Sequence, residues 1–215
     1  MDIDGYRDVL GFCTRQGHGS ARRPILGVWG RMRIVVPTIA LLVGLSVHAT
    51  HLHAQGTTVI LVRHAEKAAP TGDPGLTAAG EARAQALADA VRDFRLDGVV
   101  VTQYRRTQAT AAPAAAARGL APVLVATGLS VPAHADSVAA AVRRFPPHSA
   151  VLVVGHSNTL GPIIAALGGP ATSDLCDAEY ATMFVLTMSE SGAPARLLRA
   201  TVGAPDPPGA GSCPR

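Results

Sequence analysis

Aromatic residues are scarce in this chain of 215 residues, at 4%, and charged residues make up only 16%. No run of basic residues interleaved with aromatics occurs, which argues against a nucleic-acid-binding surface. Residues 1–54 carry six Arg and three Asp, a net of +3, and residues 55–215 carry 13 Lys and Arg against 12 Asp and Glu, a net of +1. The longer part is therefore nearly neutral, and its size predicts one globular domain.

Cysteine is also rare, with three residues in the chain, and none of the spacings is typical of a metal site. Two of the three, Cys176 and Cys213, lie in the longer part. If that part is exported to an oxidising compartment, these two can form a disulfide, and two unpaired thiols are the alternative.

The chain lacks an uninterrupted apolar run of the roughly 20 residues that a stable membrane-spanning helix needs. Its apolar run from Ile34 to Val47 is broken by Pro37 and Gly44, follows an Arg-Met-Arg sequence and precedes the small residue Ala54. This pattern is typical of a signal peptide, so we expect export to the periplasm or out of the cell.

The signal-peptide pattern also divides the chain. Since signal peptides begin at the initiating methionine, Met32 is favoured over Met1 as the start of the protein. Residues 1–31 would then precede the true start and would not be part of the translated chain. We expect a signal peptide over 32–54, the functional domain over 55–202, and a flexible tail rich in Pro and Gly over 203–215.

Predicted strands and helices alternate along residues 57–188. Alternation of short apolar runs with amphipathic, alanine-rich segments indicates an α/β fold, here a three-layer αβα sandwich with a mostly parallel central sheet. The predicted strands cover 57–62, 98–102, 122–125, 150–154 and 181–188, and the predicted helices cover 77–92, 106–118, 136–144 and 158–167.

Two predicted strands end in similar residues. Arg63 and His64 follow the first strand, and Gly155 and His156 follow the strand over 150–154. Because the carboxyl ends of parallel strands lie at one edge of a sheet, where ligands bind in such folds, we expect both histidines at one site.

Four ordered motifs then resemble those of the histidine phosphatase superfamily, the phosphoglycerate-mutase-like proteins, in what we expect to be a small exported bacterial branch. Arg63-His64-Ala65-Glu66 resembles the Arg-His-Gly-Glu signature with alanine in place of glycine, and Leu76-Thr77-Ala78-Ala79-Gly80 resembles the family's Leu-Thr-x-x-Gly. Residues 102–111 resemble Ser-x-Leu-x-Arg-Ala-x-Gln-Thr-Ala, and residues 153–157 resemble the late Gly-His motif.

The resemblance implies a phosphatase that needs neither metal nor cofactor and acts on a small phosphorylated substrate. His64 would be the nucleophile that becomes phosphorylated, and His156 would stabilise the phosphoryl group in transfer. Arg63 and Arg106 would bind phosphate oxygens through their planar guanidinium groups, with Arg105 the second choice for the latter position. The two guanidinium charges should lower the pKa of His64, which keeps its attacking nitrogen unprotonated.

The general acid that protonates the leaving oxygen is less clear from the motifs. Ser157 stands where some relatives have an aspartate, and the insertion that supplies a glutamate in others is missing. Asp136 is the only carboxylate between residues 118 and 136, and Glu66 is the second candidate, although it could instead hold His64 or an arginine.

Two other functions are compatible with the sequence. A phosphoglycerate-type mutase must cap its site against water, and this chain is short for a large cap. A non-catalytic phosphate-binding envelope protein would keep the pocket without a competent acid, which the departures at Ala65 and Ser157 allow.

Overall fold

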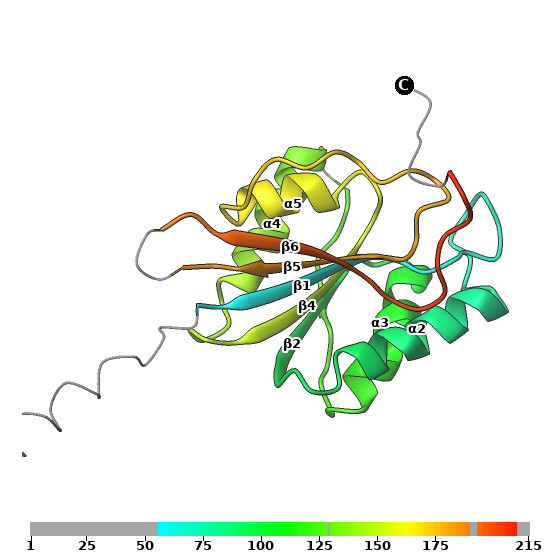
Figure 1. Ribbon diagram of the computed structural model, residues 1–215, viewed down its shortest axis with the longest axis horizontal. Helices are drawn as coiled ribbons and strands as arrows, with labels where there is room; N and C mark the ends of the chain where they lie inside the picture. Colours follow the sequence, from blue (N-terminus) through cyan, green and yellow to red (C-terminus); the bar gives the residue numbers. More distant parts are fainter. Residues whose placement is uncertain (1–55, 129, 190–192, 210–215) are drawn as a thin grey trace, which may run out of the picture. The chain divides into compact units, whose positions relative to one another are not determined.

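A central six-stranded sheet with the order β3-β2-β4-β1-β5-β6 carries the domain (Figure 1). The computed structural model describes residues 56–128, 130–189 and 193–209, so the expected signal peptide lies outside the described residues. Neighbouring strands from β3 to β1 pair in parallel, whereas β5 pairs antiparallel with β1 and β6 with β5. The strands are β1 (Thr58–Arg63), β2 (Leu96–Val101), β3 (Val123–Leu124), β4 (Ala150–Gly155), β5 (Thr182–Thr187) and β6 (Arg196–Thr201).

Two pairs of helices cover the two faces of the sheet (Figure 1). Helices α2 (Ala78–Ala90) and α3 (Arg105–Ala116) pack on one face, and α4 (Val131–Val142) and α5 (Leu160–Ala166) pack on the other. The predicted αβα sandwich with a mostly parallel sheet is confirmed. No helix in the described ranges is long and apolar enough to cross a membrane.

Strand β1 shows how the sequence builds both cores. Its side chains alternate, with Val59 and Leu61 facing the α4 and α5 cluster and Ile60 and Val62 facing the α2 and α3 cluster. Because both faces are covered, all four side chains are at most 2% exposed. A continuous apolar run is therefore what this central strand requires.

The structure corrects the prediction for α4. The helix begins at Val131, five residues before Asp136, because the Ser130 hydroxyl caps it by accepting a hydrogen bond from the Ala133 N–H at 3.4 Å. Pro132 lies in the first turn, where its missing N–H leaves no bond unmade. Asp136 therefore lies in the middle of the helix rather than near its start.

Strand β6 is absent from the sequence prediction. It is an edge strand that pairs only with β5, and four of its six residues are exposed. Its sequence, Arg-Leu-Leu-Arg-Ala-Thr, has neither the apolar run of a central strand nor a regular alternation, so no period marks it.

The segment after β6 is held to the domain at its beginning. The Arg83 guanidinium donates to the carbonyl oxygens of Val202 and Ala204, both at 2.8 Å. The Asp206 carboxylate accepts the backbone N–H groups of Tyr180 and Ala181. The first residues of the predicted tail are therefore anchored, and residues 210–215 lie outside the described part.

Gly80 has a packing role that explains its place in the Leu-Thr-x-x-Gly motif. It lies in the first turn of α2, where its N–H donates to the capping hydroxyl of Thr77 at 3.0 Å. A Cβ atom at Gly80 would lie 2.4 Å from the carbonyl oxygen of Glu66, the last residue of the Arg63-His64-Ala65-Glu66 motif. Helix α2 can approach the loop after β1 only because residue 80 has no side chain.

We therefore expect Gly80→Ala to destabilise the protein by about 1–3 kcal/mol, since the helix must move away from the Glu66 carbonyl. Glycine to alanine in a helix interior is ordinarily stabilising by about 0.5–1 kcal/mol, so the sign separates the two cases. Urea unfolding measures the difference, with Gly128→Ala as control, where an added Cβ meets nothing within 4 Å. A Gly80→Ala variant as stable as the parent would contradict this packing argument.

Candidate active site

The register between β1 and β4 brings the two motif histidines together. Arg63 pairs with Gly155 at the carboxyl ends of these parallel strands, and the His64 N–H donates to the Gly155 carbonyl at 2.9 Å. The His64 and His156 rings consequently lie with their centroids 5.4 Å apart.

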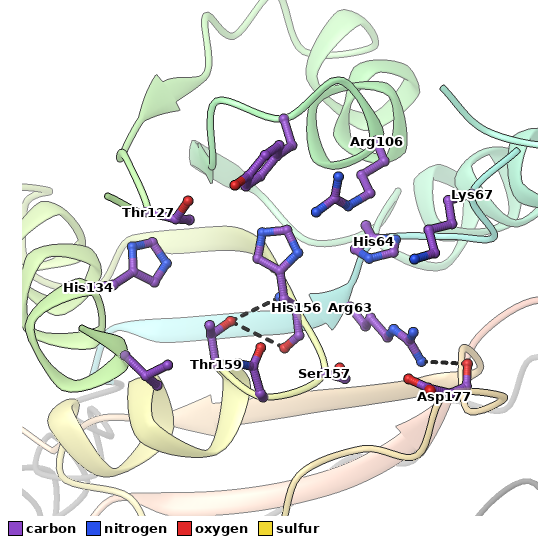
Figure 2. Close-up of a pocket in the computed structure, with 13 residues that line it drawn as sticks. Arg63, His64, Lys67, Arg106, Thr127, His134, His156, Ser157, Thr159 and Asp177 are labelled. Carbon is purple, nitrogen blue, oxygen red and sulfur yellow. Dashed lines mark hydrogen bonds between the residues drawn. The ribbon is translucent and has the colours of Figure 1, made fainter. Parts of the chain in front are cut away.

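A cavity of about 350 Å³ opens at this edge of the sheet. Figure 2 shows the side chains that converge on it from the ends of β1 and β4, from α3 and α4, and from the loop around Asp177. The four residues predicted for the pocket, Arg63, His64, Arg106 and His156, all line it. Arg105, the second choice, is exposed and does not line it.

His64 is oriented and uncharged. Its Nδ1 lies 2.8 Å from the Ala65 carbonyl oxygen, which can only accept, so Nδ1 carries the hydrogen and Nε2 is left with its lone pair. Burial lowers the pKa of His64 most, the Ala65 hydrogen bond raises it, and the charges of Arg63 and Arg106 lower it again. Together these effects bring the pKa from 6.5 to about 4. The predicted direction is right, but burial is the larger cause.

His156 is held by two threonine hydroxyls. The Thr107 hydroxyl donates to the Tyr104 carbonyl at 2.8 Å, so its oxygen accepts from Thr102 at 2.9 Å, and Thr102 in turn accepts from His156 Nε2 at 3.2 Å. Burial lowers the pKa of His156 most, followed by the repulsion that a protonated His64 would exert and by the charge of Arg106, so that the pKa falls to about 3. Both imidazoles are therefore uncharged at neutral pH.

Arg63 is fixed from one side and open on another. Its Nη1 donates to the carbonyl oxygens of Cys176, Asp177 and Glu179 at 2.8–3.1 Å, and its guanidinium stacks 4.1 Å from the Tyr180 ring centroid. Its Nε is buried and has no hydrogen-bond partner within the described residues. The charge is thus held at the cavity with donor capacity to spare.

Arg106 repeats this arrangement from the opposite wall. Its guanidinium stacks 4.2 Å from the Tyr104 ring centroid, its nearest carboxylate oxygen is Asp73 Oδ1 at 3.7 Å, and its buried Nε has no partner within the described ranges. Two stacked guanidinium groups with unused donors therefore face one cavity, an arrangement suited to the oxygens of a phosphate.

The loop that carries His64 is tied to α3 at Ala65. The Ala65 N–H donates to the Thr110 hydroxyl at 2.9 Å, and this hydroxyl donates to the Arg106 carbonyl at 2.7 Å. Ala65 is fully buried, so its methyl group fills space at a position where the superfamily signature has glycine. The departure leaves the orientation of His64 intact.

Neither of the two general-acid candidates, Asp136 and Glu66, lines the cavity. Asp136 is exposed on α4 and does not line the cavity. Glu66 forms an ion pair with Arg83 at 2.8 Å and does not line the cavity. Burial raises the pKa of Glu66, but the hydrogen bonds and charge of Arg83 outweigh that effect and lower it, so Glu66 is ionised.

Three ionisable side chains that the sequence did not single out also line the cavity: Lys67, His134 and Asp177. Lys67 is the only lysine in the chain and follows the nucleophile motif directly, which could have marked it. His134 lies in the part of α4 that was expected to be loop. Asp177 lies in the loop between α5 and β5, beyond the motifs.

No group of three or more histidine, cysteine, aspartate or glutamate side chains in the described part is arranged to hold a metal ion. Cys213 lies outside the described residues, so the disulfide with the buried Cys176 stays a prediction.

Known proteins resemble this chain both in the motifs around the cavity and in the fold. The family model of the histidine phosphatase superfamily (branch 1) matches residues 59–130, which include β1, Arg63, His64 and Arg106. Over this third of the chain the sequence is similar to the histidine phosphatase superfamily. No curated protein sequence matches it significantly.

Solved structures share the fold at low sequence identity. A candidate alpha-ribazole-5'-P phosphatase from Escherichia coli has a TM-score of 0.55 at 18% identity, over 69% of this chain and 99% of that one. A mycobacterial glucosyl-3-phosphoglycerate phosphatase in complex with VO3 has a TM-score of 0.52 at 15% identity, over 66% and 96%. Mycobacterial hydrolase 1 has a TM-score of 0.51 at 16% identity, over 66% and 97%.

The low histidine pKa values predict a specific loss of stability in acid. The folded protein keeps His64 and His156 uncharged down to about pH 4 and about pH 3, whereas each titrates near 6.5 when unfolded. As the pH falls below 6.5, the unfolded chain binds protons before the folded protein does. The contribution of the two uncharged histidines to the free energy of unfolding is therefore fully present above pH 6.5 and is lost toward pH 4. Thermal unfolding between pH 8 and pH 4 measures this loss.

The matched variant is His64→Asn, which keeps a polar side chain but removes one of the two titrating groups. We expect its unfolding temperature to fall less steeply with acid than that of the parent. Parallel curves for the two proteins would show that His64 has an ordinary pKa.

Proposed function

We propose that the protein is a phosphatase that hydrolyses a small phosphate monoester through a phosphohistidine at His64. One observation carries this proposal: an uncharged histidine, with its Nε2 lone pair freed by the Ala65 hydrogen bond, lines a cavity between two arginines with unused donors. A phosphate ester is anionic, so it needs both a neutral nucleophile and fixed positive charge.

In the first step, the unused donors of Arg63 and Arg106 bind the phosphoryl oxygens and withdraw negative charge from phosphorus. Nε2 of His64 attacks, the bond from nitrogen to phosphorus forms, and the ester bond from phosphorus to oxygen breaks. The hydrogen stays on Nδ1 and keeps its hydrogen bond to the Ala65 carbonyl oxygen, which stabilises the positive charge that develops on the ring. The alcohol leaves with a proton from a donor in the cavity or solvent.

In the second step, water attacks phosphorus from the side that the alcohol has left and returns a proton to the group that protonated the alcohol. The bond from phosphorus to His64 breaks, and inorganic phosphate is released. His156 faces the same phosphoryl group. A bound dianion raises the pKa of a neighbouring imidazole, so His156 takes up a proton when the ester binds and donates a hydrogen bond to the oxygens in transfer. The Thr102 and Thr107 hydroxyls hold its ring in place for this role.

We assign the proton for the leaving oxygen to Asp177. It is the only carboxylate among the residues that line the cavity, and its backbone carbonyl is bound by Arg63 next to the phosphate position. Asp136, the sequence candidate, is exposed outside the cavity.

The short β3–α4 connection supports a phosphatase over a mutase. It covers only residues 125–130, which leaves no room there for an insertion that would cap the cavity, and a mutase must keep its phosphoenzyme from water. The complete set of His64, His156 and two arginines supports an active enzyme over a non-catalytic phosphate-binding protein.

Purified residues 55–215 should therefore release phosphate from para-nitrophenyl phosphate and from small alkyl phosphates without added metal. His64→Ala should abolish turnover, and Arg106→Ala should lower kcat/KM by about 10²–10³, because one oxyanion-binding group is lost. Phosphate release and unfolding temperature are measured for each variant. A folded His64→Ala variant with ordinary turnover would refute the proposal.

The same panel tests the acid. Asp177→Asn should slow alkyl phosphates, whose alkoxide needs a proton, by about 10² or more, and should affect the para-nitrophenyl ester much less. Asp136→Asn serves as the control, and we expect it to leave both rates near those of the parent. A loss confined to Asp136→Asn would restore the sequence candidate.

We also propose that the protein is exported, on the strength of the residues 32–54 pattern alone. The mature chain should begin near Gln55, and amino-terminal sequencing of the protein from the exported fraction checks this. A chain that still begins at Met1 or Met32 there would contradict it.

A further inference from the structure

His134 is a buried histidine that the mechanism above does not use. It projects from the first turn of α4, is 2% exposed and lines the same cavity as His64. Figure 2 shows its ring on the side of His156 that faces away from His64. It therefore stands at the end of the cavity that would hold the alcohol part of an ester rather than its phosphate.

One nitrogen of this ring has no hydrogen-bond partner. His134 Nδ1 lies 3.1 Å from the Ala126 carbonyl oxygen and donates to it, because a carbonyl can only accept. In the uncharged ring, Nε2 is then an acceptor, and it is buried without a partner in the described part of the chain. Buried polar atoms without a partner are rare in native proteins, which marks this nitrogen as a contact point for a bound group.

Thr127 supplies the complementary group on the same side of the cavity (Figure 2). Its hydroxyl oxygen accepts a hydrogen bond from Gln103 Nε2 at 2.9 Å, and its backbone N–H donates to Gln103 Oε1 at 3.0 Å. This double contact with Gln103 fixes Thr127 and uses a lone pair of its hydroxyl, so the hydroxyl hydrogen can be donated to a ligand.

We propose that His134 and Thr127 form a hydroxyl-binding subsite, so that the natural substrate is a polyol phosphate or a sugar phosphate. A hydroxyl group can donate to His134 Nε2 and accept from Thr127 at once, whereas a carboxylate can only accept and would leave Nε2 unpaired. The inference rests on the proposed phosphatase activity and adds the class of its substrate.

The test compares esters that differ only in hydroxyl groups: glycerol 1-phosphate, 1,2-propanediol 1-phosphate and propyl phosphate. For the parent protein we expect kcat/KM to be about tenfold to 10³-fold higher for a hydroxylated ester than for propyl phosphate, because the deoxy analogue leaves the subsite unpaired. The measured quantity is this ratio, which cancels any general loss of activity in a variant.

His134→Phe, which keeps a ring but removes both nitrogens, should bring the ratio close to one, and so should the near-isosteric Thr127→Val. His148→Phe is the matched control, the same substitution at an exposed histidine outside the cavity, and should keep the parent ratio. If His134→Phe does not fold, as judged by thermal unfolding, Thr127→Val decides the question.

The outcomes separate the two proposals. A parent protein that hydrolyses propyl phosphate as efficiently as the hydroxylated esters, or folded variants that keep the parent ratio, would overturn the hydroxyl-binding subsite and leave the phosphatase standing. A parent protein that hydrolyses none of these esters, nor para-nitrophenyl phosphate, would overturn the proposed function itself.

Discussion

The parallel pairing of β1 with β4 is the constraint on which the site depends. With Arg63 opposite Gly155, the next residue along each strand is a histidine, and the His64 N–H closes the ladder on the Gly155 carbonyl. A register shift of one residue would turn His64 to the other face of the sheet and bury β1 with the wrong set of apolar side chains. The hydrophobic pattern of Val59 to Val62 therefore fixes the position of His64 as well as the core.

The chemistry follows from how the cavity combines positive charge with neutral imidazoles. Burial and the neighbouring guanidinium charges keep His64 and His156 unprotonated, while stacking on Tyr180 and Tyr104 holds the two arginines without consuming all their donors. The cavity thus presents positive charge that suits an anion. Groups that lie outside the proposed phosphate position hold both guanidinium groups in place, so the arginines have their binding geometry before a ligand arrives.

Much of the fold and the centre of the site could be predicted because they rest on local sequence. The buried strands are continuous apolar runs, and His64, His156, Arg63 and Arg106 lie inside short motifs at strand and helix ends. The position of Asp136 could not be predicted, because the helix that carries it begins at Val131 and leaves Asp136 exposed outside the cavity. His134 and Asp177 reach the cavity only through tertiary packing, and the exposed edge strand β6 leaves no periodic pattern.

The central claim is that His64 carries the phosphoryl group during turnover. Rapid mixing with ³²P-labelled ester followed by quenching in alkali should trap label on the peptide that contains His64, because a phosphorus–nitrogen bond survives base and is lost in acid. His64→Ala should show no such label. Label that is stable in acid, or that maps to another residue, would contradict the account.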